Sequence, residues 1–118
     1  MLYFLRRTGM DETIREFTKK ERFVLAGYSA GAMVLTPTIA ITTMEVTNQE
    51  GKRVPIHDVR GKSIHPGLKK DLTGLTLVDF EIIPHFEEKY ANDVELYRKK
   101  SKNKLKTCTD DEFFVIEK

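Results

Sequence analysis

Two apolar runs, at residues 23–28 and 75–84, dominate the pattern of hydrophobic and polar positions along the chain. The first run is apolar at nearly every position, which is typical of a β-strand that a sheet buries on both faces. The second run alternates in places, which also favours a strand. Small residues after the first run predict a helix that ends near Thr36, because Pro37 disfavours helical backbone in the residue before it.

Helical patterns surround these two runs. We expect helices at residues 2–7, 12–20 and 88–104. The first helix is broken at Gly9, and the side chain of Asp11 can cap the start of the second.

The remaining segments are shorter or less regular. β-branched residues at 38–47 predict a short strand, and residues 105–108 and 113–116 have the pattern of a terminal hairpin. Residues 48–73 are polar and basic, with several Gly and Pro residues, which favours a long surface loop or flap. The chain contains no internal repeat, and we expect one domain over residues 1–118.

Composition is ordinary for a soluble globular protein, at 40% hydrophobic and 32% charged residues. The formal net charge of +2 is too small to indicate binding to nucleic acid or to an acidic membrane. No run approaches the ~20 apolar residues that cross a bilayer. Cys108 is the single cysteine, so no internal disulfide can form and a cytoplasmic setting is expected. His57 and His65 lack the neighbouring ligands of a zinc site, so we expect no metal and no cofactor.

The first apolar run leads directly into a G-x-S-x-G pattern made by Gly27, Ser29 and Gly31. Between a strand and a helix, this pattern indicates a nucleophile elbow, a sharp turn that exposes the serine hydroxyl. The glycines leave room for the turn, and the helix start after it favours an oxyanion. The alternative is an ordinary strand-to-helix turn whose small residues allow close packing.

Further segments match a known family. Residues 26–33, 37–39, 74–80 and 83–86, together with the opening stretch 3–9, resemble the S51 peptidases, which include dipeptidase E and, more distantly, cyanophycinase. The resemblance implies a three-layer α/β sandwich with a mostly parallel sheet, similar to class I glutamine amidotransferases. It also implies a triad of serine, acid and histidine in that chain order.

By this resemblance, Ser29 is the nucleophile and His85 the general base, with the N–H of Ala30 in the oxyanion hole. A serine hydroxyl is a poor nucleophile until an imidazole takes its proton. The acid is expected a few residues after the 37–39 segment. Glu45 is our candidate, because Met44 falls where dipeptidase E has its aspartate.

Two alternatives concern the acid. Glu45 is a surface residue if the triad is incomplete, and Asp58 is a weaker substitute. The resemblance further implies that a β-rich half with a glycine-rich oxyanion turn precedes residue 2. We therefore expect an incomplete N-terminal half and an open sheet edge at residues 23–28. Such an edge pairs with another copy or with a complementing N-terminal fragment.

The function that this resemblance implies is a serine-type peptidase that hydrolyses short peptides, with Asp-Xaa dipeptides as one expected class. Two alternatives stay open. One is an inactive remnant or half of a split protein, which acts only through binding. The other is an amidase-like hydrolase, because one fold supports several chemistries.

Overall fold

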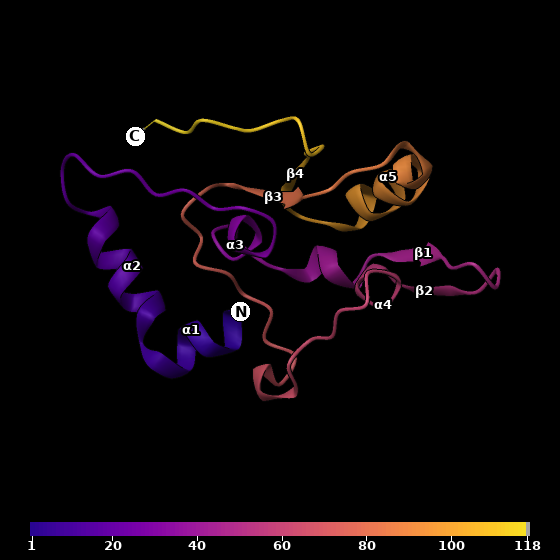
Figure 1. The fold of residues 1–118 in the computed structure, drawn as a ribbon, viewed down its shortest axis with the longest axis horizontal. Helices are drawn as coiled ribbons and strands as arrows, with labels where there is room; N and C mark the ends of the chain where they lie inside the picture. The colour runs from indigo at the N-terminus through magenta and orange to yellow at the C-terminus, as the bar shows by residue number, and fades with distance from the viewer. Residues whose placement is uncertain (118) are drawn as a thin grey trace.

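The fold begins with two short helices, α1 (Leu2–Thr8) and α2 (Met10–Thr18), in a computed structural model that describes residues 1–117 (Figure 1). The expected break at Gly9 is confirmed, because Gly9 adopts the left-handed conformation at φ 75° that glycine tolerates best. The expected cap is wrong. Gly9 occupies the N-cap of α2, and Asp11 lies within the first turn, where it pairs with Arg15 at 3.5 Å.

A parallel pair of strands, β3 (Phe80–Ile83) and β4 (Lys104–Thr107), forms the centre of the C-terminal half. They are linked through η3 (Glu88–Tyr90) and α5 (Ala91–Lys100), as parallel strands require a crossover connection. All four residues of β3 are buried, which confirms a core strand within the second apolar run. The predicted terminal hairpin is wrong, because β4 pairs with β3 and residues 113–116 form no strand.

The first apolar run does not form the expected strand. Residues 23–28 are exposed and have no regular secondary structure, although they lead into the short helix α3 (Ala30–Met33). A strand assignment requires a hydrogen-bonded neighbour, and no other described segment pairs with this run. The helix that follows also stops earlier than Thr36.

A small antiparallel pair, β1 (Glu45–Thr47) and β2 (Arg53–Pro55), extends to one side of the molecule (Figure 1). It follows η1 (Ala40–Thr43), so only the end of the expected 38–47 strand is confirmed. The predicted loop at 48–73 contains β2 and two short helical turns, α4 (Ile56–Val59) and η2 (Pro66–Leu68).

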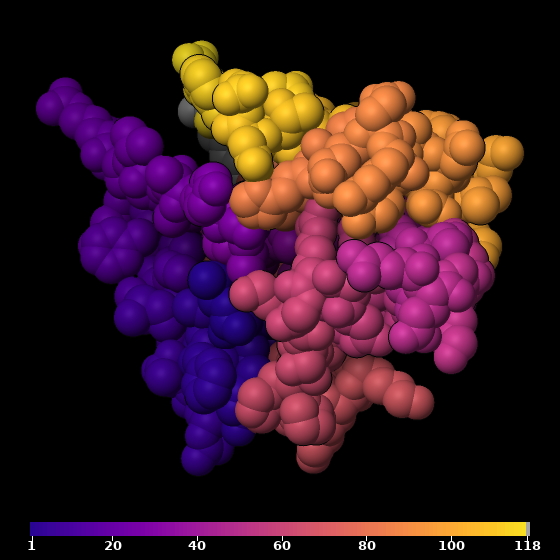
Figure 2. Space-filling model, turned by 45° about the vertical axis from the view of Figure 1, so that its right-hand side comes forward, coloured from indigo at the N-terminus to yellow at the C-terminus, as the bar shows by residue number. Residues whose placement is uncertain are grey.

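The core consists of two hydrophobic clusters. The larger lies between β3, β4, α5 and the β1–β2 pair, and the smaller lies beneath α1. In Figure 2 the N-terminal helices and the α5 region accordingly occupy opposite ends of the molecule. The structure is therefore of the α/β class with two short sheets, and no helix within residues 1–117 is long and apolar enough to span a bilayer.

Candidate active site

Ser29 occupies a sharp turn between the exposed 23–28 segment and α3. Its backbone has φ 51° and ψ −119°, a conformation that residues other than glycine rarely adopt. A Cβ on Gly27 would lie 2.8 Å from the carbonyl oxygen of Gly31, so only glycine fits there. Gly31 differs, because a Cβ there would contact nothing within 4 Å. The expectation that glycine is needed to leave room for the turn is therefore confirmed at Gly27 and wrong at Gly31.

His85 follows β3 through Pro84 and also has a positive φ, of 54°. Its Nε2 atom lies 2.9 Å from the Oγ atom of Ser29, across a separation of 56 residues. Its Nδ1 atom lies 2.5 Å from the Oδ1 atom of Asp110. Serine, imidazole and carboxylate thus form a continuous chain of contacts, in the order that nucleophilic catalysis by serine requires.

The carboxylate beside His85 is not the one that sequence reasoning selected. Glu45 lies at the start of β1 with its side chain exposed, and its backbone oxygen accepts a hydrogen bond from Arg53. Asp110 occupies the imidazole Nδ1 position instead. The three contacting groups therefore follow the chain order serine, histidine, acid.

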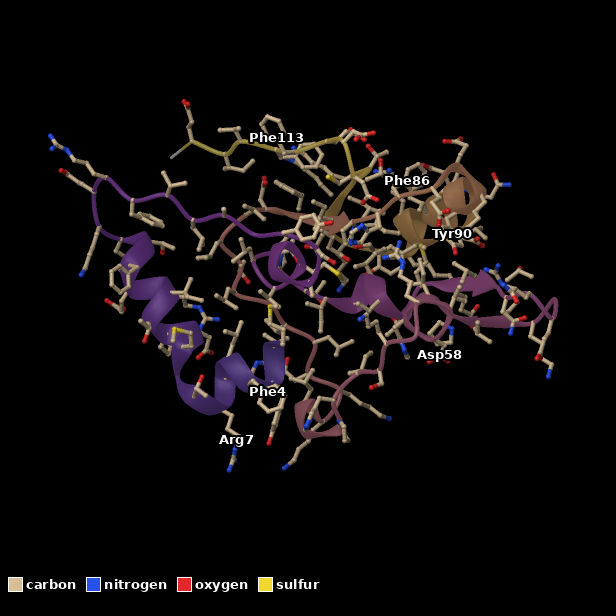
Figure 3. All side chains as sticks on the ribbon, in the orientation of Figure 1. Phe4, Arg7, Asp58, Phe86, Tyr90 and Phe113 are labelled. Carbon is tan, nitrogen blue, oxygen red and sulfur yellow. The ribbon has the colours of Figure 1, made fainter. Side chains whose placement is uncertain are left out.

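Asp58, the weaker candidate for the acid, is also absent from this chain of contacts. It lies on α4, where it pairs with His57 at 3.0 Å. Figure 3 labels Asp58 beside α4, at a different place from Phe86, the residue after His85.

A signal for Asp110 exists in the topology rather than in the sequence motif. Because β3 and β4 run in parallel, their carboxyl ends lie at the same edge of the sheet. His85 comes two residues after β3 and Asp110 three residues after β4. The expected hairpin concealed this relation, because it paired residues 105–108 with residues 113–116 instead of with β3.

Arg60 supports the turn that carries the imidazole. Its guanidinium donates to the backbone oxygen of Pro84 at 3.0 Å and to that of His85 at 3.2 Å. Burial lowers the pKa of Arg60, but arginine stays protonated at any physiological pH. The long 48–73 segment thus contributes a fixed cation directly behind the histidine.

The site is open to solvent. The side chains of His85 and Asp110 are 37% and 71% exposed. The ring of Tyr28 meets the imidazole edge-on, with 5.7 Å between ring centroids. The N–H of Ala30 donates to no other group among the described residues, so it is free to donate to a bound oxyanion.

Cys108 is half-buried just after β4, and burial raises the pKa of its thiol, which disfavours the reactive thiolate. Across residues 1–117, no three side chains of the His, Cys, Asp or Glu types gather as metal ligands would.

A family-level comparison agrees with the resemblance that the motifs carry. The model of peptidase family S51 matches residues 1–112, a range that includes Ser29, His85 and Asp110. No curated protein and no solved structure matches the chain significantly.

Proposed function

Because the chain belongs to peptidase family S51, we propose that it is a serine-type peptidase that hydrolyses short peptides through Ser29, His85 and Asp110. The observation that carries the proposal is the unbroken contact from the serine hydroxyl through the imidazole to the carboxylate. Asp110 replaces Glu45 in this proposal because it is the acid in contact with the histidine. The three-layer sandwich implied by the family is part of the same proposal, supported by the β3–α5–β4 crossover.

In the proposed reaction, the Oγ atom of Ser29 attacks the carbonyl carbon of the scissile peptide bond while Nε2 of His85 takes its proton. The carboxylate of Asp110 holds the imidazole in place and stabilises the imidazolium that forms. The free N–H of Ala30 donates to the oxyanion of the tetrahedral intermediate. His85 then returns the proton to the leaving amine, and water hydrolyses the acyl-enzyme by the same steps.

The substrate class we propose is short peptides with an acidic residue, of which Asp-Xaa dipeptides are the simplest. Two features support this class. The 48–73 segment carries an excess of lysine and arginine. The Arg60 cation lies beside the His85 turn, where it favours a nearby negative charge.

The direct test measures hydrolysis of an Asp-Xaa dipeptide by the wild-type chain and by Ser29→Ala. We expect Ser29→Ala to lower the rate by ~10³-fold or more, because the nucleophile is lost. Ser63→Ala is the matched control, since Ser63 is exposed and contacts no catalytic group, and it should keep the wild-type rate. Equal rates in the wild type and Ser29→Ala would refute the proposal.

A second candidate is binding without turnover. Two features favour it. Only one oxyanion donor, the N–H of Ala30, is assigned, and the lack of a second donor typically costs about 10²–10³ in rate. Exposed apolar residues also lie beside Ser29, where a binding partner would contact them. A fluorophosphonate probe separates the two, because the oxygen of a nucleophilic serine bonds to its phosphorus and displaces fluoride. Labelling that Ser29→Ala abolishes supports the peptidase, and absence of labelling supports the binding role. Simple amides in the same assay test the amidase-like alternative.

A further inference from the structure

An extra residue interrupts the pairing of β3 with β4 directly where the histidine turn begins. Just past the paired residues, the N–H of Cys108 donates to the oxygen of Ile83 at 3.0 Å, as a regular parallel ladder requires. The next bond of a regular ladder would come from the N–H of His85. The N–H of Phe86 makes it instead, to the oxygen of Cys108 at 3.0 Å. Pro84 and His85 therefore form a β-bulge, which re-aims a side chain at the end of a strand.

The bulge leaves two carbonyl groups outside the ladder. Among the described residues, the oxygens of Pro84 and His85 accept no backbone hydrogen bond. Both accept from the Nη2 atom of Arg60, at 3.0 Å and 3.2 Å. Within residues 1–117, the guanidinium donates to no other group and forms no ion pair. The polar contacts of Arg60 are thus committed to the two residues that present the imidazole, and bonds from a charged donor are strong ones.

The segment that carries Arg60 is itself fixed to the core. Arg60 directly follows α4, and its N–H donates to the oxygen of Ile56 at 3.1 Å. Ile56 is 2% exposed and belongs to the same hydrophobic cluster as Ile83, the last residue of β3. The guanidinium therefore joins the bulge to a helical turn that is packed against the same core as β3.

The imidazole depends on such a support. The φ of His85, 54°, is a conformation that a residue with a side chain keeps only when its surroundings enforce it. Its Nε2 atom must stay within hydrogen-bond reach of the Ser29 hydroxyl to take the proton, and the distance is 2.9 Å. A misplacement of about 1 Å in such a contact costs on the order of 10²-fold in rate. Without the bonds from Arg60, the bulge relaxes and the imidazole moves with it.

We propose that Arg60 is a positioning residue, whose two hydrogen bonds to the Pro84–His85 bulge hold the imidazole within reach of the Ser29 hydroxyl. The proposed function assigns the roles of Ser29 and His85, so the inference rests on it and deepens it. It gives Arg60 an effect on kcat. The attraction of Arg60 for acidic substrates is a separate effect, which acts on substrate binding.

The first measurement determines kcat and KM separately for an Asp-Xaa dipeptide. Arg60→Met should lower kcat at saturating substrate by about 10²-fold, because a misplaced base slows proton transfer even when all of the enzyme holds substrate. Arg60→Lys should recover part of this loss, since an ammonium keeps the charge and can donate to one of the two carbonyl groups. If Arg60→Met does not fold, Arg60→Lys provides the same comparison with a smaller loss.

Arg98→Met is the matched control. Arg98 lies on α5 and also donates to a backbone oxygen of the sheet, that of Leu105, at 2.8 Å. The substitution thus removes the same kind of bond away from the bulge, and kcat should stay at the wild-type value.

Amide hydrogen exchange tests the bulge without any assay of activity. In the wild type, the N–H groups of Phe86 and Cys108, which make the ladder bonds on either side of the bulge, should both be protected. Arg60→Met should speed exchange at Phe86 by about tenfold or more, while Cys108 stays protected. If the wild type hydrolyses no peptide, the peptidase proposal fails, and exchange at Phe86 still shows whether Arg60 holds the bulge.

Three results overturn the proposal. A wild-type kcat with a raised KM in Arg60→Met would show that the cation acts on the substrate alone. Equal exchange at Phe86 in the wild type and in Arg60→Met would show that the bulge is held without Arg60. An equal loss of kcat in Arg98→Met would show that the effect is a general loss of packing.

Discussion

Ser29, His85 and Asp110 are held by their surroundings to very different degrees. The elbow holds Ser29 through close packing, because the backbone of Gly27 lies against that of Gly31 and Ala32 with no room for a Cβ. Two hydrogen bonds from Arg60 hold the turn of His85. Asp110 is 71% exposed, and its contact with the imidazole is the side-chain interaction that orients it. The role of the acid is therefore best tested by substitution at Asp110.

We predict that Asp110→Asn lowers kcat/KM for a short peptide by about 10²–10⁴-fold. The amide keeps the size of the side chain but cannot stabilise the imidazolium or select the correct tautomer of His85. The comparison is Glu45→Gln, which should retain the wild-type kcat/KM because Glu45 makes no contact with His85. A large loss in Glu45→Gln with none in Asp110→Asn would assign the acid to Glu45.

The candidate site could be predicted from the sequence only as far as local motifs reach. The elbow pattern selects Ser29, and the end of an apolar run selects His85. Asp110 depends on which strands are neighbours and in which direction they run, and residues 105–116 favour a hairpin equally well in sequence. The crossover through α5 makes β4 run parallel to β3. No short sequence pattern encodes this pairing between segments that are distant along the chain.

At the scale of elements, the two glycines of the G-x-S-x-G motif have different roles in the structure. Gly27 approaches α3 so closely that a Cβ would lie 2.9 Å from the Cα atom of Ala32. Gly31 lies within α3, and a Cβ there would point into open space. The motif thus contains one glycine required by packing and one that the local geometry does not require.

We predict that Gly27→Ala destabilises the fold by roughly 1–3 kcal/mol, because backbone must move to accommodate the methyl group. It should also lower activity, since Ser29 moves with the turn. Gly31→Ala should keep activity and gain up to about 1 kcal/mol, because alanine favours helix over glycine. Urea unfolding of the two variants checks this order, and a reversed order would refute the steric account.

A buried carboxylate joins β3, α5 and β4. Glu81 is 1% exposed and accepts hydrogen bonds from the side chains of Tyr97, Ser101 and Asn103 at 2.6–2.9 Å. Every donor comes from α5 or from the connection to β4. The network therefore fixes the crossover that brings His85 and Asp110 together.

We predict a loss of stability at alkaline pH that depends on Tyr97. Burial, together with the hydrogen bond to Glu81, raises the pKa of Tyr97 above its ordinary value near 10. Above pH 10 the unfolded chain releases this proton while the folded chain keeps it. The unfolded state then binds fewer protons, so the free energy of unfolding falls by up to about 1.4 kcal/mol per pH unit.

Tyr97→Phe isolates this effect. It should lower stability at neutral pH by roughly 1–2 kcal/mol, because a buried acceptor loses its donor. It should also weaken the decline between about pH 10 and 11. Urea unfolding at several pH values measures both changes. Tyr28→Phe, at an exposed ring, is the control, and an unchanged alkaline slope in Tyr97→Phe would contradict the prediction.

At the scale of the whole molecule, the sequence predicts the α/β class and the second core strand, but it misjudges residues 23–28. Their apolar pattern predicts that the segment is buried, but it does not predict which element covers it. No segment within residues 1–117 covers it, so the structure has it exposed and unpaired.

The positive φ angles of Ser29 and His85 set activity against stability. Each conformation costs a residue with a side chain of order 1–3 kcal/mol, and glycine would relieve most of that cost. Glycine, however, has neither a hydroxyl nor an imidazole. A change to glycine at either position would thus strengthen the fold and remove one of the two groups on which the proposed reaction depends.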